Sequence, residues 1–251
     1  MHAQDASGGG NGMGIGHGGG GRLAYLGFGL AAAGVATILL VHWMVAFWVP
    51  TEAAQGVVQR IFYIHVPAAW TTFLAVAVAG LASAAYLWLE DERGDMAAVA
   101  AAEAALVFGA IVLLTGPLWG RLAWGTYWTW EPRLTLTLLL WFSYLGYFMI
   151  RGSVADPRKG RRFAAAVAII GALSIPLNHV SVVWFRSLHP EPVVLRTEGP
   201  SLPSEMLATL MTSLAGFTML FLGIFTVRYA MENLLRRPAS GPPPGSDGAF
   251  T

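Results

Sequence analysis

Six long apolar runs alternate with short polar segments along this chain. The runs cover residues 23–49, 61–89, 97–118, 134–150, 163–185 and 205–227. A helix needs roughly 20 apolar residues to cross the hydrocarbon layer of a bilayer, and five of the runs reach that length. The fourth run is shorter, and the aromatic segment that precedes it can extend it. The pattern therefore predicts six transmembrane helices.

Both ends of the chain differ from this pattern. Residues 1–21 contain ten glycines, and residues 238–251 are rich in proline and glycine. Segments of this kind bury too little apolar area to offset the entropy of ordering the chain. We therefore expect a disordered tail at each end and one membrane domain, residues 22–237, between them.

The composition agrees with a membrane protein and excludes several other classes. Apolar residues make up 55% of the chain, charged residues only 12%, and the mean hydropathy is +0.57. Soluble domains carry about 25% charged residues, so an ordinary soluble enzyme is excluded. The net charge of +1 gives no basic field for nucleic acid. The chain has no cysteine, which excludes disulfides, thiolate metal sites and thioether attachment of haem.

Lysine and arginine set the expected orientation, because cytoplasmic loops are enriched in them. With the N-terminus inside, the cytoplasmic side holds ten: Arg22, Arg93, Arg151, Arg158, Lys159, Arg161, Arg162, Arg228, Arg236 and Arg237. The outer side then holds five: Arg60, Arg121, Arg133, Arg186 and Arg196. We therefore expect an all-α, polytopic membrane helix bundle with both termini cytoplasmic and outer loops at 50–60, 119–133 and 186–204.

The middle outer loop, within residues 119–135, is unusually aromatic. It contains Trp119, Trp124, Tyr127, Trp128 and Trp130. Gly120 and Gly125 would allow tight turns, and Pro132 precludes a regular helix until the fourth span begins. An interfacial aromatic belt is one reading of such residues. A belt spreads tryptophan over many span ends, however, and here four of the ten tryptophans lie in one loop.

Charged residues are interleaved with these aromatic side chains, namely Arg121, Glu131 and Arg133. Aromatic faces cover flat apolar rings, and arginine pairs with carboxylates through two parallel hydrogen bonds. The loop therefore suits a large, flat, apolar ligand that carries carboxylates.

Histidines lie at matching depths beneath this loop. At 1.5 Å per residue, His65 and His179 would sit about 6 and 9 Å below the outer boundary. Pro67 and Pro176 lie near them, and helix kinks there would open space between the spans. Each histidine could instead be a structural residue hydrogen-bonded between helices. His42 has a similar depth, so spacing alone does not select two of the three.

Imidazoles without a nearby cysteine or paired carboxylate favour haem iron over zinc, since zinc prefers three or four protein ligands. Glu103 in the third span lies far from these histidines, and we expect it either to extend toward the aqueous boundary or to make a structural hydrogen bond between helices.

Three segments resemble one family. WGTYWTWEPRLT resembles the tryptophan-rich WWD signature of haem-handling proteins in cytochrome c biogenesis. RIFYIHVPAAW around His65 and IPLNHVSVVWFRSLH, which contains His179 and His189, are similar to histidine motifs of the haem exporter protein C (CcmC) family. Length and span number agree with that family, and the resemblance covers nearly all of residues 23–237. Tyr127 and Glu131 stand where tryptophan and aspartate are common in the signature.

The resemblance implies transient, non-covalent binding of haem b at the periplasmic face of the bacterial inner membrane. His65 and His179 would be the axial ligands, or one of them while an acceptor histidine takes the other position. Haem would contact Trp119, Arg121, Trp124, Gly125, Tyr127, Trp128, Trp130, Glu131, Arg133 and His189. It would then pass to a periplasmic haem chaperone, CcmE, within a complex that includes an ATPase, CcmA, and the membrane subunits CcmB and CcmD. The chain itself would not be an enzyme.

Two other functions fit parts of the sequence. A b-type cytochrome subunit that exchanges electrons with quinol would also hold haem between helices. A permease or scaffold subunit would use the same histidines and tryptophans for structure alone.

Overall fold

Six long helices account for most of the computed structural model, which describes residues 18–185, 188–189 and 201–236. They are α1 (Gly18–Phe47), α2 (Phe62–Leu89), α3 (Glu92–Trp124), α4 (Pro132–Ser153), α5 (Pro157–Trp184) and α6 (Ser204–Leu235), with a short 3₁₀ helix at Val57–Ile61. Each is long and apolar enough to cross a membrane. The all-α fold with six spans is therefore confirmed. The expected tails fall largely outside the described residues, although α1 already begins at Gly18.

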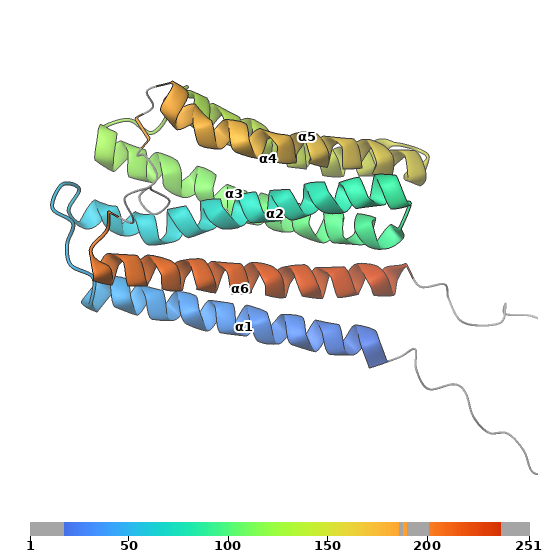
Figure 1. Ribbon diagram of the computed structural model, residues 1–251, viewed down its shortest axis with the longest axis horizontal. Helices are drawn as coiled ribbons and strands as arrows, with labels where there is room; N and C mark the ends of the chain where they lie inside the picture. Colours follow the sequence, from blue (N-terminus) through green and yellow to red (C-terminus); the bar gives the residue numbers. More distant parts are fainter. Residues whose placement is uncertain (1–17, 186–187, 190–200, 237–251) are drawn as a thin grey trace, which may run out of the picture.

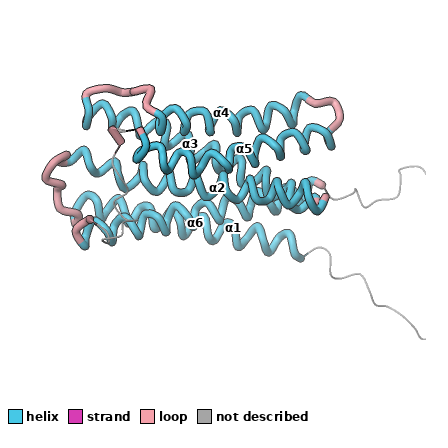
Figure 2. The backbone as a smooth tube through the Cα atoms, turned by 45° about the horizontal axis from the view of Figure 1, so that its top comes forward, coloured by secondary structure: helices cyan, strands magenta, loops and turns pink. Residues whose placement is uncertain are grey.

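The helices form three antiparallel pairs that lie in layers (Figure 1). The pair α2–α3 lies between the pairs α4–α5 and α1–α6. The loop at 48–56 and the loop at 125–131 lie at one end of the bundle, which we call the cavity end (Figure 2). α1 begins and α6 ends at the opposite end, which we call the ion-pair end.

Glycine allows α1 and α6 to approach closely. A Cβ atom on Gly34 would lie 2.5 Å from the backbone nitrogen of Leu220, and one on Gly223 would lie 2.4 Å from that of Ala31. Only a residue without a side chain fits at such distances. Small residues at helix crossings are typical of membrane bundles, because association there relies on close van der Waals packing.

Small residues also fill the interface between α2 and α3. Ala68, Ala75 and Ala79 of α2 pack with a run of buried alanines in α3. Tyr144 of α4 reaches into this core, and its hydroxyl donates to the carbonyl of Val76 at 3.2 Å. This packing fixes the three central elements that hold the site described below.

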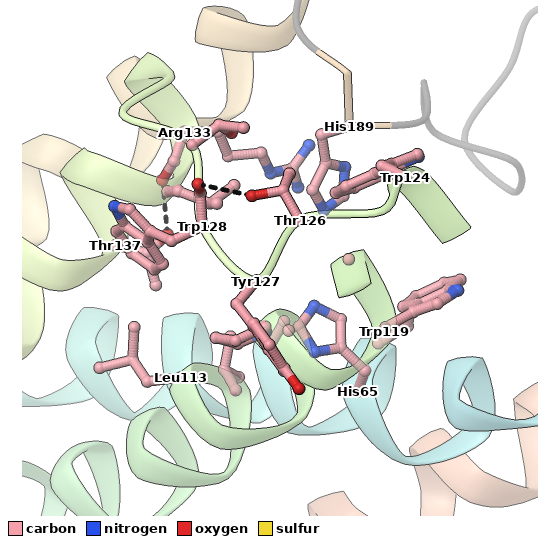
Figure 3. A pocket seen from close by; sticks show the side chains of 18 of the residues that line it. His65, Leu113, Trp119, Trp124, Thr126, Tyr127, Trp128, Arg133, Thr137 and His189 are labelled. Carbon is pink, nitrogen blue, oxygen red and sulfur yellow. Dashed lines mark hydrogen bonds between the residues drawn. The ribbon is translucent and has the colours of Figure 1, made fainter. Parts of the chain in front are cut away.

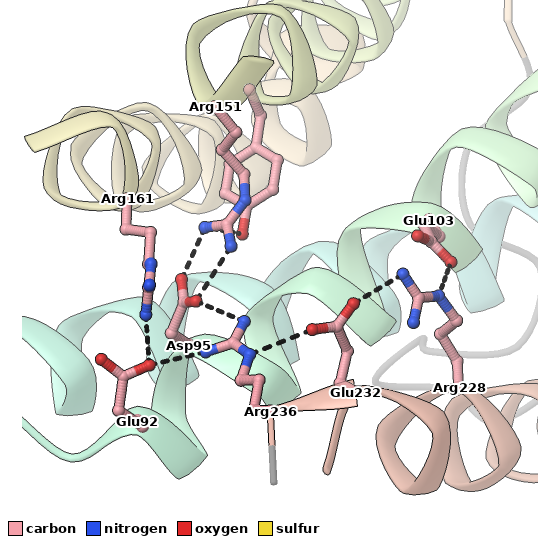
Figure 4. Close-up of polar contacts among 9 residues, drawn as sticks. Glu92, Asp95, Glu103, Arg151, Arg161, Arg228, Glu232 and Arg236 are labelled. Carbon is pink, nitrogen blue, oxygen red and sulfur yellow. Dashed lines mark hydrogen bonds and ion pairs between the residues drawn. The ribbon is translucent and has the colours of Figure 1, made fainter. Parts of the chain in front are cut away.

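A network of charged side chains ties the helices together at the ion-pair end (Figure 4). Asp95 of α3, with 1% of its surface exposed, accepts two hydrogen bonds from Arg151 of α4 at 2.6 and 2.9 Å. Arg236, the residue that follows α6, donates to the same carboxylate at 2.8 Å. Arg236 also pairs with Glu92 at 2.7 Å and with Glu232 at 3.1 Å. One buried carboxylate thus links three helices.

Two further arginines extend this network. Arg161 of α5 pairs with Glu92, and Arg228 of α6 pairs with Glu103 at 2.6 Å and with Glu232 at 2.8 Å. The interhelical hydrogen bond expected for Glu103 is therefore present, in the form of an ion pair.

Candidate functional site

A cavity lies at the cavity end, beneath the loop at 125–131. Its volume is about 1130 Å³, a value that includes the part open to solvent. Its walls come from α2, α3, α4 and the loops around them. The lining residues are Gln55, His65, Val66, Ala69, Thr72, Phe73, Val112, Leu113, Gly116, Pro117, Trp119, Gly120, Trp124, Thr126, Tyr127, Trp128, Thr129, Arg133, Leu134, Thr137 and His189.

The aromatic loop is shorter than its sequence suggested, because α3 continues through Trp119 to Trp124. Gly125 ends the helix with φ of 79°, a left-handed conformation that favours glycine. Pro132 then begins α4. The turn expected at Gly125 is confirmed, whereas the turn expected at Gly120 and the non-helical backbone expected from residue 119 onward are wrong. Gly120 is helical, and a Cβ atom there would lie 3.1 Å from the carbonyl oxygen of Thr126.

His65 lies in the first turn of α2, with 8% of its surface exposed. Its Nδ1 lies 2.8 Å from Oγ1 of Thr115 on α3. The edge of its ring meets the ring of Trp119, with centroids 5.6 Å apart. A Cβ atom on Gly116 would lie 3.2 Å from the imidazole, so the absence of a side chain there makes room for it. His65 is therefore held by two helices at the cavity wall.

His189 lines the same cavity from the third outer loop. The neighbouring backbone N–H of Leu188 donates to the Glu131 carboxylate at 2.9 Å. In the view of Figure 3, His189 and Arg133 lie on one side of the loop and His65 lies on the other, with Tyr127 between them. Glu131 does not line the cavity and instead holds the segment that carries His189.

The structure places His179 and His42 away from this cavity. His179 lies on the exposed side of α5, whereas its neighbour Asn178 is buried and donates to Thr137 of α4 at 2.9 Å. His42 is exposed on α1, where its Nδ1 lies 2.8 Å from the carbonyl of Ile38. Matching depth therefore does not bring these histidines to the loop, because a step of one residue turns a side chain by about 100° around a helix.

The two arginines of the loop have different surroundings. Arg133 lines the cavity, and its guanidinium makes no ion pair with any described residue. Arg121 is exposed outside the lining residues, donates to the carbonyl of Gly125 and lies 5.7 Å from the centre of the Tyr127 ring. Arg133 is thus the only arginine or lysine that lines the cavity in the described part of the chain.

The loop aromatics divide in a similar way. Trp119, Trp124, Tyr127 and Trp128 line the cavity. Trp130 is 77% exposed and meets the edge of Trp128 at 5.7 Å between ring centroids. Trp130 and Trp128 border a second, shallower hollow, together with Leu113, Pro117 and Leu138.

Two contacts of the site had no signal in the sequence. The indole N–H of Trp119 donates to Oε1 of Gln55 at 2.8 Å, and Thr115 contacts His65. Gln55 lies in a turn in which the Glu52 carboxylate accepts from the backbone N–H groups of Gln55 and Ala54. These hydrogen bonds lower the pKa of Glu52 below its ordinary value. Polar residues in short loops and single threonines in apolar helices carry no periodic pattern, so these two residues were not predicted.

The cavity has the chemistry to hold a flat, anionic, metal-containing ring. Aromatic and apolar side chains cover most of its wall, and two imidazoles can supply nitrogen ligands. Arg133 can pair with a carboxylate, and no carboxylate of the described residues lines the wall to compete for it. The indole N–H of Trp128 is buried without a hydrogen-bond partner among the described residues.

Comparison with known proteins gives one consistent result. The family model for "Heme exporter protein C" matches residues 23–241. A Heme exporter protein C from Bradyrhizobium diazoefficiens is 37% identical over 211 residues, which cover 84% of this chain and 80% of the relative. The proteins of that name from Haemophilus influenzae and Escherichia coli K12 are each 34% identical. The former match covers 80% of both chains, and the latter covers 83% of this chain and 85% of the relative.

Proposed function

This chain belongs to the haem exporter protein C family, and from that membership we propose that its cavity binds haem for delivery during cytochrome c maturation. The observation that carries the proposal is the cavity lining, which combines two imidazoles, one arginine and an aromatic loop without a carboxylate. Haem is the cargo here, held without a covalent bond and released again. The protein acts as a transport subunit rather than an enzyme.

We assign the parts of haem to the wall as follows. Trp119, Trp124, Tyr127 and Trp128 cover the porphyrin faces and edges, where aromatic contacts replace water. Arg133 pairs with a propionate, because it is the arginine that lines the cavity and its guanidinium makes no ion pair with a described residue. Arg121, Gly125 and Trp130 act at the rim, where they shape the loop and its exposed surface.

The geometry favours His65 and His189 as the two iron ligands. The family resemblance paired His65 with His179, but His179 is exposed on α5 and does not line the cavity, whereas His189 lines it. His65 sits on a rigid helix, and His189 sits on a loop tied to Glu131 through Leu188. A ligand on a loop can leave the iron without moving a helix, which suits a site that must release its cargo.

Delivery follows from where the cavity opens. The excess of arginine and lysine near the ion-pair end supports a cytoplasmic location for that end, with the cavity end facing the periplasm of a bacterial inner membrane. A periplasmic haem chaperone of the CcmE type can then reach the exposed Tyr127 and Trp130. An ATPase and membrane subunits of the CcmA, CcmB and CcmD types would complete the exporter, and ATP hydrolysis would reside in the ATPase.

The test is the visible absorption spectrum of the detergent-purified protein, oxidised and reduced, for the parent and four histidine variants. His65→Ala and His189→Ala should lose or alter the haem spectrum, because each removes a ligand. His179→Ala and His42→Ala are matched controls at similar depth and should keep the parental spectrum. A changed spectrum in His179→Ala with a parental one in His189→Ala would restore the pairing that the sequence suggested.

Two further outcomes separate this function from the alternatives. A parent that binds no haem when haem is supplied would favour a scaffold role. A parent whose haem exchanges electrons rapidly with quinol but does not pass to the chaperone would favour a b-type cytochrome.

A further inference from the structure

Thr115 is the one described side chain that hydrogen-bonds the His65 imidazole. Oγ1 of Thr115 lies 2.8 Å from Nδ1 of His65, on the neighbouring helix. The same hydroxyl lies 2.7 Å from the carbonyl oxygen of Ile111, one turn earlier in α3. A hydroxyl has a single hydrogen to donate, and a carbonyl oxygen can only accept. Both short contacts can be hydrogen bonds at once only if Thr115 donates to the Ile111 carbonyl and accepts from Nδ1 of His65.

These two hydrogen bonds of Thr115 determine which nitrogen of His65 carries the proton. With its hydrogen used, the Thr115 hydroxyl can only accept from the imidazole, so Nδ1 must be the protonated nitrogen. Nε2 then keeps its lone pair, which is the form that binds a metal. We propose that Thr115 is a positioning residue that fixes the His65 tautomer and so presents Nε2 to iron; this inference rests on the proposed function of His65 as a haem ligand.

Two further residues of α3 lie against the ring. Gly116, the residue after Thr115, leaves the space that the imidazole occupies, since a Cβ atom there would lie 3.2 Å from its Cε1 carbon. Trp119, one turn further along α3, meets the ring edge-on. Residues 115, 116 and 119 of one helix therefore all lie against the ring: Thr115 hydrogen-bonds it, Gly116 leaves space for it, and Trp119 contacts its edge.

The proposal predicts a specific change in haem binding. Thr115→Val keeps the shape of the side chain but removes the hydrogen-bond acceptor. Loss of such a partner of a metal-binding histidine costs on the order of 10–100-fold in affinity, because the tautomer and the basicity of the ligand are no longer supported. The midpoint potential of the bound haem should also rise, since a less basic imidazole stabilises ferric iron less well.

The experiment measures haem affinity and midpoint potential in detergent for the parent, Thr115→Val, Thr115→Ser and His65→Ala. Thr115→Ser keeps the hydroxyl and should restore both parental values. Thr209→Val is the matched control, because Thr209 is a buried threonine of α6 that also donates to the carbonyl four residues earlier, at 2.8 Å, but does not line the cavity. It should bind haem as the parent does. If Thr115→Val fails to fold, Thr115→Ala takes its place.

Three results would overturn the proposal. If Thr115→Val keeps the parental affinity and potential while His65→Ala loses haem, the positioning role is wrong and the proposed function stands. If Thr115→Ser is as impaired as Thr115→Val, the methyl group matters rather than the hydroxyl. If His65→Ala itself binds haem normally, the ligand assignment and the role of Thr115 are both wrong.

Discussion

The two ends of the bundle use arginine in opposite ways. At the ion-pair end, Arg151 and Arg236 donate to a carboxylate that is almost fully buried, and Arg161 and Arg228 also pair with acids. At the cavity end, Arg133 faces a cavity without any carboxylate among its described lining residues. The contrast teaches that an arginine with acidic partners holds helices together, whereas one without them is available to a ligand.

The cost of burial explains the difference. A buried charge is tolerated in a low-dielectric region only when it is paired and hydrogen-bonded. Asp95 meets that condition through Arg151 and Arg236. Arg133 is only partly buried at the cavity end of the bundle. Water can therefore hydrogen-bond to its guanidinium until an anionic ligand displaces that water.

Removing the charge of Asp95 should have the largest effect. Asp95→Asn keeps the volume of the side chain but leaves two arginines facing an uncharged amide. Breaking a buried ion pair on one side costs about 3–5 kcal/mol in the free energy of unfolding. Chemical denaturation in detergent checks this loss. The haem affinity of the folded fraction should stay parental, and a loss of haem binding without a loss of stability would break the division between the two ends.

Arg133→Ala should weaken haem binding without destabilising the fold. A hydrogen bond to a charged group contributes about 1.5–3 kcal/mol, which corresponds to a roughly 10–150-fold lower affinity. Arg121→Ala is the matched control in the same loop. Titration of each variant with haem measures both affinities, and an equal or larger effect for Arg121 would refute the assignment of Arg133 to a propionate.

Arg161→Ala should have the smallest effect, although it also removes an ion pair. The side chains of Arg161 and Glu92 are 29% and 56% exposed, so water screens the pair. Such pairs contribute about 0–1 kcal/mol to the free energy of unfolding. Denaturation measured beside Asp95→Asn would show whether burial, rather than the number of ion pairs, stabilises this end. A loss equal to that of Asp95→Asn would argue against burial as the cause.

The fold was predictable because its signal is long and repeated. Each of the six apolar runs overlaps one helix, since roughly 20 apolar residues have few alternatives to a membrane-spanning helix. The end of α3 was less predictable. Trp119 and Arg121 read as loop residues, but the helix continues to Gly125, the next residue that readily adopts a left-handed conformation.

The site was predictable in its composition but not in its geometry. The clustered tryptophans, Arg133 and His65 stood out because polar and aromatic side chains are conspicuous beside apolar spans. Whether His179 can reach the cavity depends on which face of α5 packs against α4. The buried Asn178 lies on that face and donates to Thr137, so His179 does not. Thr115 was invisible for the same reason, because its contact joins two helices whose rotation the sequence does not specify.

The close interface between α1 and α6 affects the order in which the bundle assembles during synthesis. α1 packs mainly against α6, which leaves the ribosome after the other five described helices. At 5–20 residues per second, synthesis of the intervening residues takes on the order of 10–30 s. During that interval the first helix waits in the bilayer with its glycine face against lipid. The pair therefore forms only after α6 has been made, when α6 docks against α1.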